Sequence, residues 1–410
     1  MDTVSFRDLS VEEFDTTTLL AHATQQAIQR RYEDFLIVDI DGHHYETASF
    51  AQICEFIEDP VMRQQAKYQG YGGGGITQGA GNYQELGGRV TRYAGRRNEK
   101  VPPSPHRDIT LTRRWMDAIG IDILNLFPTP MLGLGFTPRV EVEVALARAY
   151  NRWLIEVVLA GEPRIRASLY LPMKDPEAAY KMVEDFADKK GVVGFTVCTP
   201  RYARLYDNAY VKTYRAIEER VLPLVFHSGL GGGGDQSLSL CNRFIAAHAL
   251  GFSWWNILHC TNWLVNGMPE RFPKLKTIWV ESGLAWIPFL MQRLDNEWMM
   301  RSSEVPLLKK RPSDYMREMY YSTQPMEMVH NREALELTFK MMNAETQLMY
   351  ASDYPHWDTD LPSTIYDLPF LSEQAKRNIL GGNAKRVFNL EPVISETKAK
   401  RLAARTHATA

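Results

Sequence analysis

Eight short apolar runs, separated by helical segments, restrict the fold of this chain more than any other feature of its sequence. The runs begin near residues 35, 121, 165, 192, 222, 275, 319 and 347. Such runs are typical of buried parallel strands, and segments such as VEVEVALARAYNRWLIEVVLA and PEAAYKMVEDFADKK are helical in pattern. Eight alternating units predict an α/β protein, a single (β/α)8 barrel with its active site at the carboxyl ends of the strands.

Three parts follow from this pattern. Residues 1–33 have apolar positions at helical spacing and predict an N-terminal helical arm, residues 34–392 the barrel, and residues 393–410 a basic C-terminal tail that is mobile or clamps a partner. Within the barrel, residues from about 47 to 108 are rich in Gly and Pro and predict an irregular lid insertion after the first strand. No lysine follows these glycines at phosphate-loop spacing, so the insertion is not a Walker motif.

Composition excludes several classes of function. The chain has 47 Lys and Arg against 49 Asp and Glu, so there is no excess of positive charge for nucleic acid. No apolar run is long enough for a transmembrane helix, and the acidic start MDTVSFRDLSVEEFD does not resemble a signal peptide. The four cysteines are widely separated, as in proteins of reducing compartments. We therefore expect a cytoplasmic protein that acts on a small molecule, with neither nucleic acid nor membrane as partner.

Polar side chains collect where the predicted strands end. Asp39, Asp41 and His43 alternate along the first strand and should face the barrel mouth together. Further polar residues end or follow later strands, namely His227, Glu281, Asp353 and His356. Buried carboxylates and imidazoles are costly to hold together unless a cation lies among them. We therefore predict one divalent metal ion, Zn²⁺ first and Mn²⁺ or Fe²⁺ next.

Four motifs resemble the amidohydrolase-related (amidohydrolase 2) branch of the amidohydrolase superfamily: DGHHYE, FHSG, MPERFPKLKTIWVESGLAWIPFLMQRLD and YASDYPHWD. That branch includes aminocarboxymuconate-semialdehyde decarboxylase and the dihydroxybenzoate decarboxylases, and the resemblance covers roughly residues 35–392. It implies a metal site formed by Asp41, His43, His227 and Asp353, with Asp353 also able to act as a base. It also implies a homo- or hetero-oligomer.

The chain departs from the family pattern at two positions. Asp41 stands where the common pattern has His, which favours metals that prefer oxygen ligands. Glu281 stands where many of the decarboxylases have a catalytic His. The predicted strand VVGFTVC has no lysine, so a carbamate-bridged pair of metals is not expected. A mononuclear site is preferred, and a second ion held by Glu46, His259 or Glu281 stays open.

Several of these residues also have purely structural interpretations. Glu46 is favoured as a partner that fixes His43, and His44 should face away from the barrel lumen. His248 and His259 are about three helical turns apart, which is equally consistent with core packing. Asp353 could likewise be a helix N-cap. In a functional role, His356 is expected to orient the substrate if it does not cap the loop, and Arg97 or Arg107 in the insertion could bind a carboxylate.

Two reactions suit such a site. We rank first a metal-dependent hydrolase that cleaves an amide, ester or related bond, in which Asp353 takes a proton from metal-activated water and His227 and Glu281 stabilise charge or move the proton. The alternative is a non-oxidative decarboxylase of a carboxylated aromatic or related acid, with a protonated Glu281 as proton donor. The His-to-Glu departure places this route second. An Fe- or Mn-dependent oxygenase and an inactive structural subunit of a hetero-oligomer are further alternatives.

Overall fold

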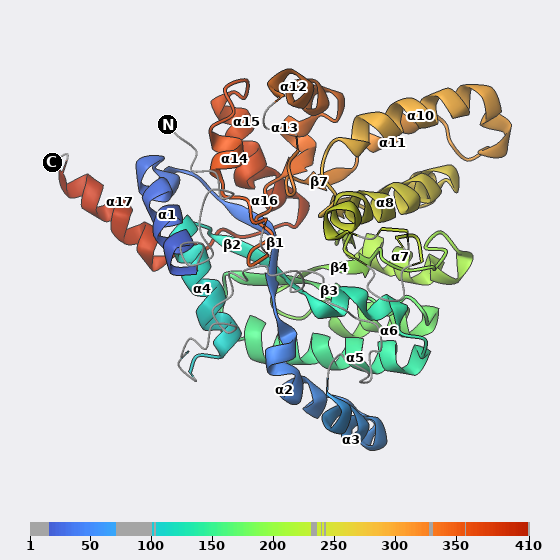
Figure 1. Cartoon of the computed structure of the whole chain (residues 1–410), viewed down its shortest axis with the longest axis horizontal. Coiled ribbons are helices and arrows are strands. Elements are labelled where there is room, and N and C mark those ends of the chain that lie inside the picture. Colours follow the sequence, from blue (N-terminus) through green and yellow to red (C-terminus); the bar gives the residue numbers. More distant parts are fainter. Residues whose placement is uncertain are drawn as a thin grey trace.

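The computed structural model describes residues 16–70, 101, 104–230, 236–238, 240–241, 243–327, 331–356 and 358–408, in which eight parallel strands pair in chain order (Figure 1). The strands are β1 Val38–His44, β2 Ile123–Pro128, β3 Ile165–Tyr170, β4 Val192–Cys198, β5 Leu224–His227, β6 Thr277–Val280, β7 Tyr320–Ser322 and β8 Leu348–Met349. All eight predicted strands are present, and the predicted (β/α)8 barrel is confirmed.

The barrel is closed by the segment that follows β8. Its main chain runs beside β1, with Ile40 N donating to Tyr350 O at 3.0 Å and His43 N donating to Tyr354 O at 2.7 Å. Asp353 N donates to Asp41 O at 2.8 Å. The first and last strand segments therefore share a seam, and this seam lies at two of the positions predicted to bind metal.

Helices surround the strands (Figure 1). The longer ones are α1 Thr16–Gln29, α4 Arg107–Ile119, α5 Val140–Trp153, α6 Pro176–Phe186, α7 Val211–Glu219, α8 Phe244–Val265, α10 Trp286–Arg301 and α12 Arg332–Met341. Local signals set their ends: Asp175 caps α6 by accepting from Glu177 N and Ala178 N, and Pro176 occupies its first turn. The helices predicted from residues 140 and 176 are both present.

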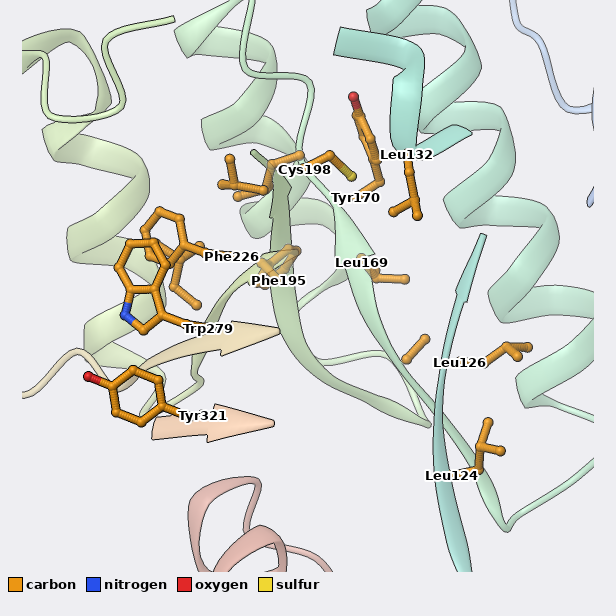
Figure 2. Close-up of a cluster of buried hydrophobic side chains, with 14 of the residues drawn as sticks. Leu124, Leu126, Leu132, Leu169, Tyr170, Phe195, Cys198, Phe226, Trp279 and Tyr321 are labelled. Carbon is orange, nitrogen blue, oxygen red and sulfur yellow. The ribbon is translucent and has the colours of Figure 1, made fainter. Parts of the chain in front are cut away.

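Alternation along the strands separates an outer core from the lumen. Leu224 and Phe226 of β5 belong to the large cluster between strands and helices, where Phe226 stacks on Trp279 with ring centroids 4.2 Å apart (Figure 2). Val225 belongs instead to a second cluster of strand residues inside the barrel. His227 follows Val225 by two residues and so faces the lumen.

Part of the predicted insertion is regular. Residues 50–55 form α2, Phe50–Glu55, and residues 60–69 form α3, Pro60–Gln69, so the expectation of an irregular segment from about 47 to 108 is wrong there. Asp59 provides the local reason, since its carboxylate caps α3 by accepting from Met62 N at 2.6 Å, with Pro60 at the first helical position. The glycine-rich residues 71–100, with Arg97 and the predicted lid, lie outside the described residues.

The C-terminal segment forms helix α17, Glu396–Ala408, which packs on the barrel through the contacts below, so the expectation of a mobile tail is wrong, whereas its role as a clamp on a partner stays a prediction. Lys398 Nζ donates to Asp122 Oδ2 at 2.6 Å and to Phe35 O. Asp122 directly precedes β2, and Phe35 lies just before the start of β1. Arg405 forms ion pairs with Glu33 and Asp34. Lys398 and Arg405 of this segment therefore pair with carboxylates of the same chain. The division into arm, barrel and tail stays a prediction.

Candidate metal and catalytic site

A bulge in β1 brings the first two predicted ligands into the lumen. Val38 and Ile40 belong to the inner cluster, and the pairing of β1 with β2 shifts register between Asp39 and Gly42. The extra residue reverses the alternation, so Asp41 and His43 face inward as well. A Cβ at position 42 would lie 2.6 Å from a methyl carbon of Leu124, so a larger residue there would require the Leu124 side chain to shift.

Asp39 does not join these two residues, contrary to the sequence-based expectation. Its carboxylate accepts from Ser352 N at 2.9 Å, from Ser352 Oγ at 2.5 Å and from Asp41 N at 3.1 Å. Burial raises the pKa of Asp39 to about 7, although the hydrogen bonds from Ser352 oppose the shift. Asp39 therefore links β1 to the segment after β8. It lies beneath the site, because the bulge separates Asp39 from the ligands Asp41 and His43.

Both lumen imidazoles are oriented by main-chain carbonyls. His43 Nδ1 donates to Pro128 O at 2.8 Å, and His227 Nδ1 donates to Ser228 O at 2.7 Å. With Nδ1 protonated, the Nε2 lone pair of each ring is available as a ligand. Both Nε2 atoms point to one carboxylate: Asp41 Oδ1 lies 3.1 Å from that of His43 and 3.0 Å from that of His227.

Asp353 reaches the same place from the other side of the seam. Its Oδ1 lies 3.3 Å from His43 Nε2 and 2.6 Å from His356 Nδ1, and its Oδ2 accepts from Gln324 Nε2 at 3.2 Å. His356 Nε2 lies 3.2 Å from Thr129 Oγ1, and its ring lies 4.4 Å from that of His43. His356 is thus in contact with a predicted ligand, rather than only a cap of the loop.

Two acidic residues of the site have strained backbones. Glu281 and Asp353 have φ angles of 56° and 57°, in the left-handed region that residues other than glycine rarely adopt. Val280 faces the lumen, so a regular strand would turn Glu281 outward, and the left-handed conformation returns it to within 3.4 Å of His227 Nδ1. Ser322 Oγ accepts from Glu281 N at 3.1 Å and helps to hold it there. Such strain costs on the order of 1 kcal/mol or more per residue and is typical of functional sites.

The assembled residues form two groups with metal-binding geometry. Donor atoms of Asp41, His43, His227 and Glu281 lie within 4.8 Å of one another, as do those of His43, Asp353 and His356. Every one of these side chains is buried. Among the described residues, Asp41 Oδ2, His43 Nε2 and Glu281 Oε2 are buried without a hydrogen-bond partner. Buried polar atoms of this kind are costly unless a ligand completes them, and one divalent cation fits this donor set.

Electrostatics lead to the same conclusion. Burial raises the pKa of Asp353 well above its usual value, and Glu281 and Asp358 raise it further. The pKa of Glu281 is raised in the same way, first by burial and then by Asp41. For Asp41, burial would raise the pKa, but His227 and His43 together hold it low. Without a cation, these carboxyl groups cannot all ionise at neutral pH.

Glu46 and His259, considered above for a second ion, serve the main chain instead. Glu46 accepts from Thr129 N at 2.9 Å and Met131 N at 2.6 Å, so it fixes the loop after β2 and not His43. His259 Nε2 donates to Thr199 O at 3.0 Å, consistent with the core-packing interpretation. Of the three residues considered for a second ion, Glu281 alone lies in the cluster. His44 faces away from it and lies 2.9 Å from Tyr150 OH, as predicted.

Sequence reasoning missed Gln324, whose amide contacts both Asp353 and Asp358. The available signal was its position just after the strand MYYST, where the carboxyl end of a barrel strand contributes to the active site. Arg107, which was considered as a carboxylate clamp, forms an ion pair with Asp108 at 3.1 Å. It is therefore already engaged with an acid of its own chain.

Comparison with known proteins identifies the family of this chain. The amidohydrolase family model matches residues 112–390, more than half of the sequence. The chain belongs to the amidohydrolase family. Membership confirms the resemblance seen in its motifs and makes the protein a metal-dependent hydrolase or carbon–carbon lyase of the amidohydrolase superfamily.

The curated relatives within this family include decarboxylases. Gamma-resorcylate decarboxylase of Polaromonas sp. (strain JS666 / ATCC BAA-500) is 25% identical over 291 residues, which cover 68% of this chain and 86% of that protein. The 2-amino-3-carboxymuconate-6-semialdehyde decarboxylase of Dictyostelium discoideum is 22% identical over 289 residues, covering 70% of this chain and 77% of that protein.

Solved structures of the same fold extend over nearly the whole chain. The 5-carboxyvanillate decarboxylase of Sphingomonas paucimobilis has a TM-score of 0.62 at 20% identity and covers 87% of this chain and 100% of its own. A dihydroxybenzoic acid decarboxylase of Polaromonas sp. JS666, solved with manganese and 2-nitroresorcinol, has a TM-score of 0.58 at 18% identity, over 87% and 97% of the two chains. These likenesses confirm the fold.

In the part of the chain that the structure describes, no helix combines the length and apolarity needed to cross a membrane. The cytoplasmic location and the homo- or hetero-oligomeric state stay predictions.

Proposed function

We propose that this protein is a metal-dependent, non-oxidative decarboxylase of an aromatic hydroxy acid. The buried donor cluster at the carboxyl ends of the strands carries this proposal, because it fits a cation in a chain whose curated relatives include two decarboxylases. These relatives favour decarboxylation. The sequence motifs alone had led us to rank hydrolysis first. An oxygenase or an inactive subunit gains no comparable support.

We propose Asp41, His43, His227 and Asp353 as the metal ligands. The Nε2 atoms of His43 and His227 both lie close to Asp41 Oδ1, and Asp353 Oδ1 lies close to the same Nε2 atom of His43. Carboxylate-rich ligand sets favour Mn²⁺ over the Zn²⁺ that was expected first, and three solved structures of similar fold hold manganese. We therefore rank Mn²⁺ ahead of Zn²⁺.

When bound, the cation acts as a Lewis acid toward a substrate carboxylate and an adjacent hydroxyl oxygen. The reaction breaks the bond between the ring carbon and the carboxylate, carbon dioxide leaves, and the electron pair remains on the ring. A proton must then reach that carbon. Glu281 is the proposed donor, because its carboxyl group is buried within the cluster and its Oε2 has no hydrogen-bond partner among the described residues. His356 holds Asp353 through the 2.6 Å contact.

Product analysis tests the proposal. Protein loaded with Mn²⁺ or with Zn²⁺ is incubated with 2,6-dihydroxybenzoate and 5-carboxyvanillate, and in parallel with aryl amides and esters. We expect carbon dioxide and the matching phenol from at least one acid, and elemental mass spectrometry should find about one metal ion per chain. Amide or ester cleavage without carbon dioxide release would return hydrolysis to first place.

A further inference from the structure

Gln324 is a buried residue that joins two carboxylates across the site. It follows β7, its side chain is fully buried, and its Nε2 donates to Asp353 Oδ2 at 3.2 Å and to Asp358 Oδ2 at 3.3 Å. The backbone is held too, because Ser322 Oγ donates to Gln324 O at 3.2 Å and accepts from Glu281 N. Gln324 is thus fixed by the same hydroxyl that positions Glu281.

The two carboxylates determine the orientation of the amide. In the metal-loaded protein Asp353 is a carboxylate ligand whose oxygens are acceptors, so Asp353 requires the NH₂ group of Gln324, and a flipped amide would place its oxygen against a negative charge. Both hydrogens of Nε2 are used by these acceptors. Oε1 is left on the other side of the amide, and among the described residues it is buried without a hydrogen-bond partner.

A carbonyl oxygen in this condition requires a donor. The amide lies between Asp353, which is buried within the metal cluster, and Asp358, whose side chain is 16% exposed and lies 3.6 Å from His248 Nε2. A ligand bound at the metal cluster beside Asp353 would therefore lie close to this amide. An aromatic hydroxyl is a donor that the proposed substrate class supplies.

We propose that Gln324 Oε1 accepts a hydrogen bond from a ring hydroxyl of the substrate and so sets a preference for acids with that hydroxyl. This inference rests on the proposed function, because it assigns a specificity role within the same site. A site with a fixed, buried acceptor rejects an analogue that lacks the donor, since the acceptor is then left unpaired.

Binding of two probes that differ by one hydroxyl tests this role without turnover. Titration calorimetry on the manganese-loaded protein compares 2-nitroresorcinol with 2-nitrophenol. We expect the natural chain to prefer 2-nitroresorcinol by about tenfold or more, and Gln324→Met, which keeps the size but removes the amide, to lose most of that preference. Failure of 2-nitroresorcinol to bind the natural chain, or an unchanged preference in Gln324→Met, would overturn the role.

Gln347→Met is the matched control. Gln347 is also buried, and its Nε2 donates to Met319 O just before β7, at the opposite end of the strands. We expect this variant to keep the full hydroxyl preference. Should Gln324→Met not fold, Gln324→Leu removes the same amide and should also lose most of the preference, and an unchanged preference there would contradict the proposal.

Turnover separates this inference from the proposed function. With 2,6-dihydroxybenzoate and 2-hydroxybenzoate, we expect the ratio of kcat/KM values to fall in Gln324→Met, with metal content unchanged. Carbon dioxide release with an equal ratio in both proteins would overturn the Gln324 role alone and leave water as the partner of Oε1. Loss of hydroxyl preference in the binding assay without any carbon dioxide release would overturn decarboxylation and leave the Gln324 role standing.

Discussion

Buried charges lie at both ends of the barrel, but they are paired with opposite charges at one end only. At the N-terminal ends of the strands, Lys398 Nζ lies 2.6 Å from Asp122 Oδ2 and Arg164 Nη1 lies 2.6 Å from Asp117 Oδ1. At the opposite ends, Asp41, Glu281 and Asp353 crowd around two imidazoles. The first set pairs opposite charges within the chain, whereas the second is incomplete without a cation. The first therefore stabilises the fold, and the second is built for binding.

The carboxyl-end cluster also contains strained backbone. Glu281 and Asp353, with φ angles near 56°, belong to the carboxyl-end cluster. Lys398 lies within the regular helix α17, and Arg164 directly precedes β3. Within the cluster, left-handed backbone and unpaired buried atoms occur together, as is typical of sites where a protein gives up stability for function.

The largest expected effect comes from Asp353→Asn. We expect a loss of about a thousandfold or more in kcat/KM together with weaker metal binding, because the variant removes a proposed ligand. The metal-free variant should melt at the same temperature as the natural protein or higher, since one of three crowded carboxylates is gone. Kinetics, metal analysis and calorimetry check this, and full activity would contradict the proposed site.

Lys398→Met should have the opposite effects, a loss of stability without a loss of activity. Removing the cation leaves Asp122 buried without its partner, which costs about 3–5 kcal/mol in the free energy of unfolding. Activity per folded molecule should be unchanged, because the change lies at the far end of the barrel. Urea denaturation and kinetics measure both. Lys400→Met, on the same helix with a side chain 81% exposed, is the control, and equal destabilisation by both changes would refute the distinction.

The stability of the metal-free protein should depend on pH through the buried carboxyl group of Glu46. Burial raises the pKa of Glu46 from 4.5 to about 7, so the folded chain holds this proton more tightly than the unfolded chain does. Stability should therefore fall as pH rises from about 4.5 to 7, by on the order of 3 kcal/mol for this group, and level off above. Glu46→Gln should flatten the slope in urea titrations, and an unchanged slope would exclude Glu46 as its source.

The smallest effect is expected from Arg405→Ala, also on α17. Arg405 forms ion pairs with Glu33 and Asp34, but its side chain is 43% exposed, and exposed pairs contribute little to stability. We expect a melting temperature close to that of the natural protein and a salt-insensitive activity. A loss as large as that of Lys398→Met would mean that the whole helix, and not the buried pair, secures the N-terminal end.

The strand pattern and the positions of polar residues at strand ends predicted the barrel and most members of the cluster. Period-two alternation holds along β5, so His227 was placed correctly. The same alternation fails at Asp39, because a bulge cannot be read from the spacing of polar residues. It would also have turned Glu281 outward, and the left-handed backbone that returns it depends on Ser322, which is 41 residues later in the chain.

Contacts between distant residues account for the remaining errors. Lys398 and Asp122 are 276 residues apart, so local composition predicted a basic tail where the structure has a buried ion pair. For Gln324 the only signal is its position just after a barrel strand, because an isolated glutamine there is ordinary until Asp353 and Asp358 are placed beside it. By contrast, α3 had a readable cap at Asp59 that the neighbouring glycines obscured.

The seam between β1 and the segment after β8 has a consequence for synthesis on the ribosome. Asp41 and His43 emerge early, but the strand partner that completes their surroundings, with Asp353, is translated about three hundred residues later. At about 5–20 residues per second, the nascent chain carries an incomplete proposed metal site for about 15–60 s. Loading of the ion is therefore expected to follow release of the finished chain, so the metal supply acts on the full-length protein and not on its folding intermediates.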